Sequence, residues 1–137
     1  MKKRMPVSKI MSTDLLSVNT SQNLREVDAI IKNQHIRHVP VVSGDKIIGM
    51  LSKTDLQKIS FVNTMDGDGL TTAMYDNLSI EQVMTKDITT VDQDDTILDV
   101  ATILSKNEFH ALPVTSGGSL VGIVTTTDLV KFLIDQY

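Results

Sequence analysis

The feature that most constrains the fold of this chain is an internal repeat that needs no gap. An offset of 73 residues places Pro40 on Pro113 and superimposes the run Thr54-Asp55-Leu56 on Thr127-Asp128-Leu129. At many other positions the two copies exchange one apolar residue for another, such as Leu24 for Ile97 or Ile47 for Leu120, as a duplicated hydrophobic core would. The chain therefore consists of two copies of a unit of about fifty residues.

The spacing of apolar residues predicts the local structure of each copy. The apolar residues Leu15, Leu16 and Val18 indicate a short strand, as do Ile88 and Val91 in the second copy. Apolar residues spaced three and four apart over residues 24–31 and 97–104 indicate an apolar helix face in each copy. Asn23 or Ser21 can cap the first of these helices. Two apolar runs on either side of residues 43–46, repeated around 116–119, indicate hairpins. A closing helix is expected to begin near Thr54, and again near Thr127.

Each copy is thus predicted to be strand, helix, strand, strand, helix. A single copy of this size is too small to cover the apolar side of its own sheet. We expect the two copies to pack together as one α/β (α+β) module spanning residues 1–137. The expected repeats are residues 7–61 and 80–137, joined by a linker and leading helix over 62–79. Within that segment, residues 62–72 read as the polar linker. Residues 72–84 read as helical, with Ser79 and Gln82 spaced as a capping box.

Composition excludes several functions. The net charge of −4 argues against nucleic acid as a partner, because a nucleic-acid surface must neutralise many phosphates. The chain has no cysteine, which fits a reducing, cytoplasmic location. Eighteen apolar residues never run together, so we expect no membrane insertion. No Gly-x-Ser-x-Gly, His-Glu-x-x-His or Walker-type run occurs, so the protein is not expected to be an enzyme.

Two motifs resemble a known family. The β-α-β-β-α order, the runs Val39-Pro40-Val41 and Leu112-Pro113-Val114, and the elements at residues 49–55 and 122–128 resemble the cystathionine-β-synthase-type (CBS) repeat. In that family, the pattern Gly-apolar-x-(Ser/Thr)-x-(Ser/Thr)-Asp binds ribose and phosphate. The resemblance implies two repeats packed about a pseudo-twofold axis, with two clefts. It also implies a regulatory sensor that binds an adenosine nucleotide (AMP, ADP or ATP) and reports its presence to an effector protein.

The chemistry of these residues suits such a ligand. A helix that begins near Thr54 or Thr127 presents unpaired N–H groups to an anion. An ionised Asp55 or Asp128 can accept hydrogen bonds from both hydroxyls of a ribose. The resemblance assigns to one cleft Met11, Asp14, Leu16, Ile36, Arg37, His38, Thr125, Thr127 and Asp128. To the other cleft it assigns Met84, Asp87, Thr89, Phe109, His110, Ala111, Ser52, Thr54 and Asp55.

The two clefts are not equivalent, and other interpretations stay open. Arg37, permanently charged, is the stronger phosphate candidate, and Ala111 stands where the first repeat has His38. The runs Ser52-x-x-Asp55 and Thr125-x-x-Asp128 are also capping boxes, which begin helices without any ligand. The alternatives are therefore a ligand-free dimeric interaction scaffold, or a sensor of S-adenosylmethionine, NAD or Mg²⁺.

No metal ion is expected as a cofactor. The acidic cluster at Asp92, Asp94 and Asp95 precedes a helix, where negative charge is favourable, and leaves only weak Mg²⁺ binding open. The run at residues 66–69 lacks the ligand pattern of a calcium loop.

The closing helices are expected to form a homodimer interface. Apolar residues spread around more than one side of the last helix: Leu129, Val130, Phe132, Leu133, Ile134 and Tyr137. Such a helix is expected to be buried on two sides. Phe61 and Val62 extend the equivalent helix of the first repeat.

Overall fold

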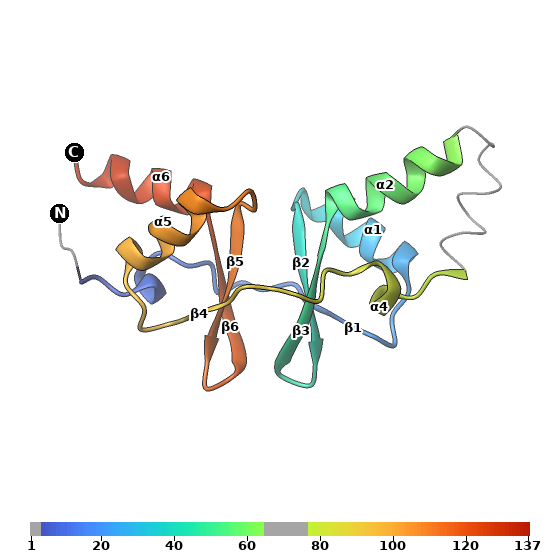
Figure 1. Ribbon diagram of the computed structural model, residues 1–137, viewed down its shortest axis with the longest axis horizontal. Helices are drawn as coiled ribbons and strands as arrows, with labels where there is room; N and C mark the ends of the chain where they lie inside the picture. The colour runs from blue at the N-terminus through green and yellow to red at the C-terminus, as the bar shows by residue number, and fades with distance from the viewer. Residues whose placement is uncertain (1–3, 65–76) are drawn as a thin grey trace. The chain divides into compact units, whose positions relative to one another are not determined.

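The computed structural model describes residues 4–64 and 77–137, and of residues 60–64 only the backbone. The chain divides into two compact units (Figure 1). The α1–α2 unit, named for its helices α1 (Leu24–Gln34) and α2 (Lys53–Thr64), comprises Leu16–Ile88. The α5–α6 unit, named for α5 (Ile97–Lys106) and α6 (Thr126–Asp135), combines Met1–Leu15 with Thr89–Tyr137. The second unit therefore contains both ends of the chain.

The α1–α2 unit has three strands beside its helices. They are β1 (Val18–Asn19), β2 (His38–Ser43) and β3 (Lys46–Ser52), and a short helix, α4 (Ile80–Val83), completes the unit. Strand β1 pairs in parallel with β2, and β2 pairs antiparallel with β3. The predicted order of strand, helix, strand, strand, helix is confirmed.

The α5–α6 unit repeats this arrangement. Its strands are β4 (Val91–Asp92), β5 (Ala111–Ser116) and β6 (Ser119–Thr125), and the short 3₁₀ helix η1 (Val7–Lys9) takes the place of α4. Strand β4 is parallel to β5, and β5 is antiparallel to β6. Both units are mixed α/β structures, as the repeat predicts.

Local signals explain why these elements form where they do. The side chain of Asn23 accepts a hydrogen bond from the backbone N–H of Glu26 and so caps α1. The β2–β3 turn contains Gly44 with φ +65°, a conformation that glycine adopts without steric cost. The predicted hairpin and the predicted Asn23 cap are therefore confirmed.

Some boundaries differ from those expected. Strand β1 begins only at Val18, so Leu16 stands outside the sheet and is 41% exposed. Helix α2 continues to Thr64, so residues 62–64 are helical, whereas residues 65–72 of the expected linker lie outside the described residues. The expected helix over 72–84 is interrupted at Leu78 and Ser79, because Ser79 has an extended backbone and caps α4. Residues 72–76 also lie outside the described residues.

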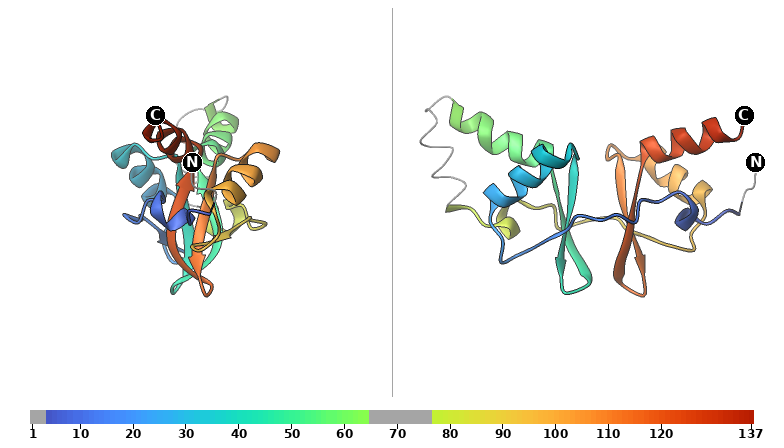
Figure 2. Two further views of the ribbon diagram at one scale, coloured as in Figure 1. Left: turned by 90° about the vertical axis from the view of Figure 1, so that its left-hand side faces the viewer. Right: turned by 180° about the vertical axis from the view of Figure 1, so that it is seen from behind.

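Each unit has its own hydrophobic core. In the α1–α2 unit it is formed by Val18, Leu24, Val27, Ile31, Val39, Val41, Leu51, Leu56, Ile59 and Ile80. In the α5–α6 unit it is formed by Val7, Val91, Val100, Leu104, Leu112, Val114 and Val124. Val7 and Ile80 occupy equivalent positions of the repeat, and both are fully buried. The first residues of each sequence repeat therefore pack into the core of the unit that holds most of the other repeat. Figure 2 shows the two units from two further sides.

Candidate functional site

The two closing helices begin in the same way. In α2, Asp55 N–H donates to Ser52 Oγ at 3.0 Å, and Ser52 N–H donates to Asp55 Oδ2 at 2.9 Å. In α6, Asp128 N–H donates to Thr125 Oγ1 at 3.2 Å, and Thr125 N–H donates to Asp128 Oδ2 at 2.8 Å. Both are capping boxes, as predicted, and they place Ser52 and Thr125 at the helix caps. The helices start at Lys53 and Thr126, one residue earlier than expected.

Each capping box uses only one of the two carboxylate oxygens of its aspartate. Within the part of the chain that the structure describes, Oδ2 of Asp55 and of Asp128 accepts hydrogen bonds, whereas Oδ1 of each accepts none. Both carboxylates are half-buried, and Thr54 and Thr127 are exposed on the first helical turn beside them. Each helix start thus offers one carboxylate oxygen and one hydroxyl to a ligand.

A backbone contact joins each helix start to the residues just before the second strand of its repeat, β2 or β5. Lys53 N–H donates to the carbonyl oxygen of Arg37 at 2.8 Å, and Thr126 N–H donates to that of His110 at 2.9 Å. Arg37 and His110 are equivalent positions of the repeat. Each therefore lies beside the helix start of its own repeat. The sequence does not reveal this neighbour, because the contact joins backbone atoms and does not depend on residue type.

Two methionines lie against the strands that lead to these helices. Met84 packs on Gly49 of β3, and Met11 packs on Gly122 of β6; a Cβ on either glycine would stand 2.9 Å from the methionine Cγ. Backbone hydrogen bonds hold the same segments, since Ser12 pairs with Ile123 and Thr85 pairs with Met50. The glycines are therefore required for close approach of the two segments.

The predicted site residues divide between the two units. The α5–α6 unit holds Met11, Asp14, Thr89, Phe109, His110, Ala111, Thr125, Thr127 and Asp128. The α1–α2 unit holds Leu16, Ile36, Arg37, His38, Ser52, Thr54, Asp55, Met84 and Asp87. Each predicted cleft combines residues of both units, and its assembly stays a prediction. Within a unit, the structure joins the helix start to the residue before the second strand, and it packs the methionine on the strand that leads to the helix.

Some of these residues also have structural roles. Ile36 and Met84 pack against the core of the α1–α2 unit, and Met11 packs against that of the α5–α6 unit. Ala111 is buried. By contrast, Leu16 and Phe109 are apolar and exposed, at 41% and 36%. Of the apolar residues predicted for the site, these two expose the most surface that could contact a flat ring.

In the acidic cluster, carboxylate oxygens of Asp92 and Asp95 accept hydrogen bonds from backbone N–H groups of the same turn. Asp92 N–H donates to Asp95 Oδ2, and Asp94 N–H donates to Asp92 Oδ1, each at 2.9 Å. The N-cap of α5 is Thr96, with Asp99 completing the capping box. No group of three or more His, Asp or Glu side chains placed to hold a metal ion occurs within residues 4–64 and 77–137. The run at residues 66–69 lies outside the described residues.

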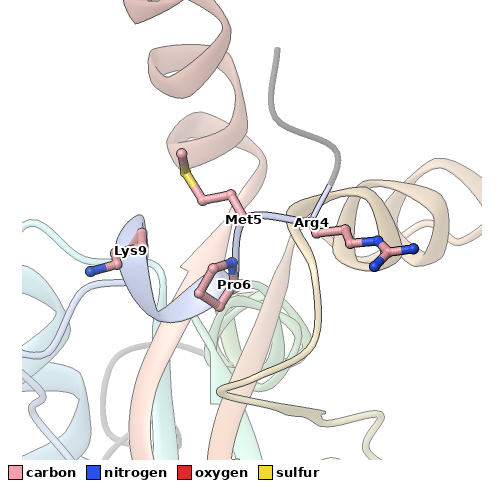
Figure 3. A pocket seen from close by; sticks show the side chains of 4 residues that line it. All are labelled: Arg4, Met5, Pro6 and Lys9. Atoms are coloured by element: carbon pink, nitrogen blue, oxygen red, sulfur yellow. The ribbon is translucent and has the colours of Figure 1, made fainter.

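The sequence did not predict a shallow cavity of about 440 Å³ beside η1, lined by Arg4, Met5, Pro6 and Lys9. Figure 3 shows that the side chains of Arg4 and Lys9 point away from each other. Their charges therefore do not converge on one anion. Separately, none of the helices described here is long and apolar enough to cross a membrane.

Comparison with known proteins identifies one family. A family model described as "CBS domain" matches residues 7–61 and 80–135. The uncharacterised protein MJ1232 of Methanocaldococcus jannaschii is 26% identical over 127 residues, which are 90% of this chain and 38% of MJ1232. The chain likewise spans less than half of the length of two further relatives from that organism.

Two solved structures have a similar fold. The CBS domain pair of MJ0100, solved in complex with 5′-methylthioadenosine and S-adenosyl-L-methionine, has a TM-score of 0.75 and 25% identity. That match covers 94% of this chain and 99% of the MJ0100 chain. CBSX2, solved in complex with AMP, has a TM-score of 0.81 and 20% identity, covering 96% of this chain and 98% of CBSX2.

Proposed function

Because the chain belongs to the CBS domain family and carries the repeat twice, we propose that it is a regulatory module that binds an adenosine nucleotide of the AMP, ADP or ATP type. The observation that carries this proposal is the pair of helix starts, where Asp55 and Asp128 each keep Oδ1 without a hydrogen bond among the described residues. The ligands of the similar structures support it, since AMP, 5′-methylthioadenosine and S-adenosyl-L-methionine all carry adenine on a ribose with free 2′ and 3′ hydroxyls.

The ribose is the part of adenosine that these aspartates suit best. A carboxylate oxygen accepts hydrogen bonds from hydroxyl groups and donates none, so it can hold a diol. The exposed hydroxyls of Thr54 and Thr127 on the same helical turns add donors for a phosphate. The positive end of each helix dipole favours the same anion. In this proposal Asp55 and Asp128 therefore hold the ribose, and the helix starts hold the 5′ phosphate.

Adenine and phosphate need further contacts. Leu16 and Phe109 have exposed apolar surface that can contact a purine ring. Arg37 is exposed, permanently charged and joined through its carbonyl oxygen to the start of α2. We assign the base to Leu16 in the cleft that contains Asp128 and to Phe109 in the cleft that contains Asp55. In the first of these clefts we assign the phosphate to Arg37 as well as to the helix start, which favours a nucleotide over 5′-methylthioadenosine.

A thermal-shift comparison tests this function. AMP, ADP and ATP should raise the melting temperature, because a ligand that binds only the folded state stabilises it by about 2.7 kcal/mol at roughly one hundred times its Kd. GMP at the same concentrations, with the same ribose phosphate and a different base, is the matched control and should raise it less. If none of the adenosine nucleotides changes the melting temperature, the nucleotide-binding proposal is wrong.

The second candidate function is a ligand-free scaffold. It is favoured by the two capping boxes, which are complete as helix starts without any bound molecule. With either function, we propose that the protein forms a homodimer through α2 and α6 and is located in the cytoplasm. We also propose that an effector protein responds to the state of the module. On the α2 side this interface would include Phe61 and Val62, whose side chains lie outside the described residues.

A further inference from the structure

Residues assigned to different clefts are joined by a hydrogen bond inside the α1–α2 unit. Lys53 N–H donates to the carbonyl oxygen of Arg37 at 2.8 Å. Arg37 belongs to the predicted cleft that contains Asp128, which we call the Asp128 cleft. Lys53 is the first residue of α2, the helix that carries Asp55 and its own predicted cleft, the Asp55 cleft. The contact therefore joins a residue of one cleft to the helix start of the other, and we call it the Lys53 link.

The α5–α6 unit contains the same kind of contact in the opposite direction. Thr126 is the first residue of α6, which carries Asp128. Its N–H donates to the carbonyl oxygen of His110 at 2.9 Å, and its Oγ1 donates to the same oxygen at 3.3 Å. Because His110 is assigned to the Asp55 cleft, this contact, the Thr126 link, again joins residues of different clefts. Each unit thus carries one link between the clefts.

The two links lie at the open ends of the β-hairpins. The pairing of β2 with β3 ends at His38 and Ser52, and that of β5 with β6 ends at Ala111 and Thr125. Each link adds one hydrogen bond beyond this last pair, and the residues that it joins are exposed. Hydrogen bonds at the exposed end of an element open at a small cost in free energy, so a bound ligand can change how often they are closed.

We propose that the two links couple the clefts, so that a nucleotide in either cleft raises the affinity of the other. This inference rests on the proposed nucleotide binding and adds cooperativity to it. A phosphate bound by the guanidinium of Arg37 orders that residue and keeps its carbonyl oxygen in place for Lys53 N–H. The first turn of α2, with Asp55, is then ordered before a second nucleotide binds. The second nucleotide therefore binds with a smaller loss of conformational entropy.

Two properties of the coupling follow from the chemistry of the links. Coupling free energies are reciprocal, so each nucleotide must raise the affinity of the other by the same factor. In the Asp128 cleft the effect depends on the phosphate, because that is the group assigned to Arg37. Adenosine has no phosphate and should therefore fill this cleft without closing the Lys53 link.

Hydrogen exchange in the Asp55→Asn variant tests the Lys53 link. Asparagine keeps an oxygen for the capping hydrogen bond but replaces the other carboxylate oxygen by an NH₂ group, which cannot accept from a ribose hydroxyl. AMP should then fill only the Asp128 cleft. It should slow exchange of the Lys53 amide by about fivefold or more, which is the lower end of typical couplings between sites. NMR measures each amide with and without AMP.

The same experiment contains its controls. Asp99 N–H donates to Thr96 Oγ1 at 3.0 Å in the capping box of α5 and is assigned to neither cleft, so its exchange should not change. Adenosine at saturating concentration should leave exchange of the Lys53 amide as it is without ligand. In Asp128→Asn, where AMP should fill only the Asp55 cleft, the amide that slows should be that of Thr126.

Affinity gives an independent readout of the coupling. By isothermal titration, AMP should bind the unaltered Asp128 cleft of Asp55→Asn about fivefold more weakly than in the parent, because the other cleft stays empty. Clefts that act independently would give the same Kd in both proteins.

The outcomes separate this coupling from the nucleotide-binding proposal. A parent protein that binds no AMP overturns both. A parent that binds AMP in one cleft only, or AMP binding that leaves exchange of the Lys53 and Thr126 amides unchanged, overturns the coupling alone. Equal slowing of the Asp99 amide would show general stabilisation of the fold and would also overturn the links. An equal effect of adenosine would overturn the role given to Arg37.

Discussion

At the scale of single residues, the glycines of β3 and β6 decide how closely a neighbouring segment can approach. Met84 and Met11 occupy the space that a Cβ on Gly49 or Gly122 would need. The repeat makes both pairs visible in the sequence, because Met11 matches Met84 and Gly49 matches Gly122. It does not show that methionine and glycine touch, since the partners are far apart along the chain.

The Gly122→Ala variant tests this contact. The new Cβ would stand 2.9 Å from Met11 Cγ and 3.1 Å from the carbonyl oxygen of Ser12, so the segment must shift. We expect a loss of about 1–3 kcal/mol in the free energy of unfolding, as for an overpacked core. In the double variant with Met11→Ala the loss should be smaller than the sum of the two single losses. Urea denaturation of all four proteins gives the coupling, and strict additivity would contradict the contact.

At the scale of elements, local signals were sufficient where the physical cause is local. Helix caps, hairpin turns and the apolar face of α1 depend on residues within a few positions of each other, and the sequence predicted them. The packing of η1 and α4 has a distant cause. Nothing in the spacing around Val7 or Ile80 shows that each enters the core of the other repeat.

The Ile80→Ala variant tests the role of α4. Ile80 is fully buried in the α1–α2 unit, so its truncation should lower the free energy of unfolding by about 2–5 kcal/mol. Glu81 is the exposed neighbour in the same short helix, and Glu81→Ala should change it by less than about 1 kcal/mol. Chemical denaturation measures both. Equal, small losses would mean that α4 does not belong to this core.

At the scale of the whole molecule, the boundaries of the sequence repeat differ from those of the compact units. The matched family regions are residues 7–61 and 80–135, whereas the α5–α6 unit joins Met1–Leu15 to Thr89–Tyr137. Distance along the sequence also limits how much of the candidate site can be predicted from the sequence. The capping boxes at Asp55 and Asp128 are local and were predicted, but the clefts join residues distant in sequence and remain predictions.

The central claim is that Asp55 and Asp128 hold a nucleotide as well as cap a helix. Isothermal titration of AMP into Asp128→Ala and Asp55→Ala tests it most directly. Loss of hydrogen bonds to a charged acceptor costs about 1.5–3 kcal/mol, so affinity should fall at least about tenfold at each altered site.

Asp99→Ala is the matched control, because Asp99 completes the same capping box with Thr96 in α5 and is not a predicted site residue. Like the Asp55 and Asp128 variants, it should lower the free energy of unfolding by about 0.5–2 kcal/mol, because a helix cap is lost. Unlike them, it should bind AMP as the parent does. If the parent binds AMP and the Asp55 and Asp128 variants bind it as tightly as the Asp99 variant, the two aspartates are helix caps alone and the site assigned here is wrong.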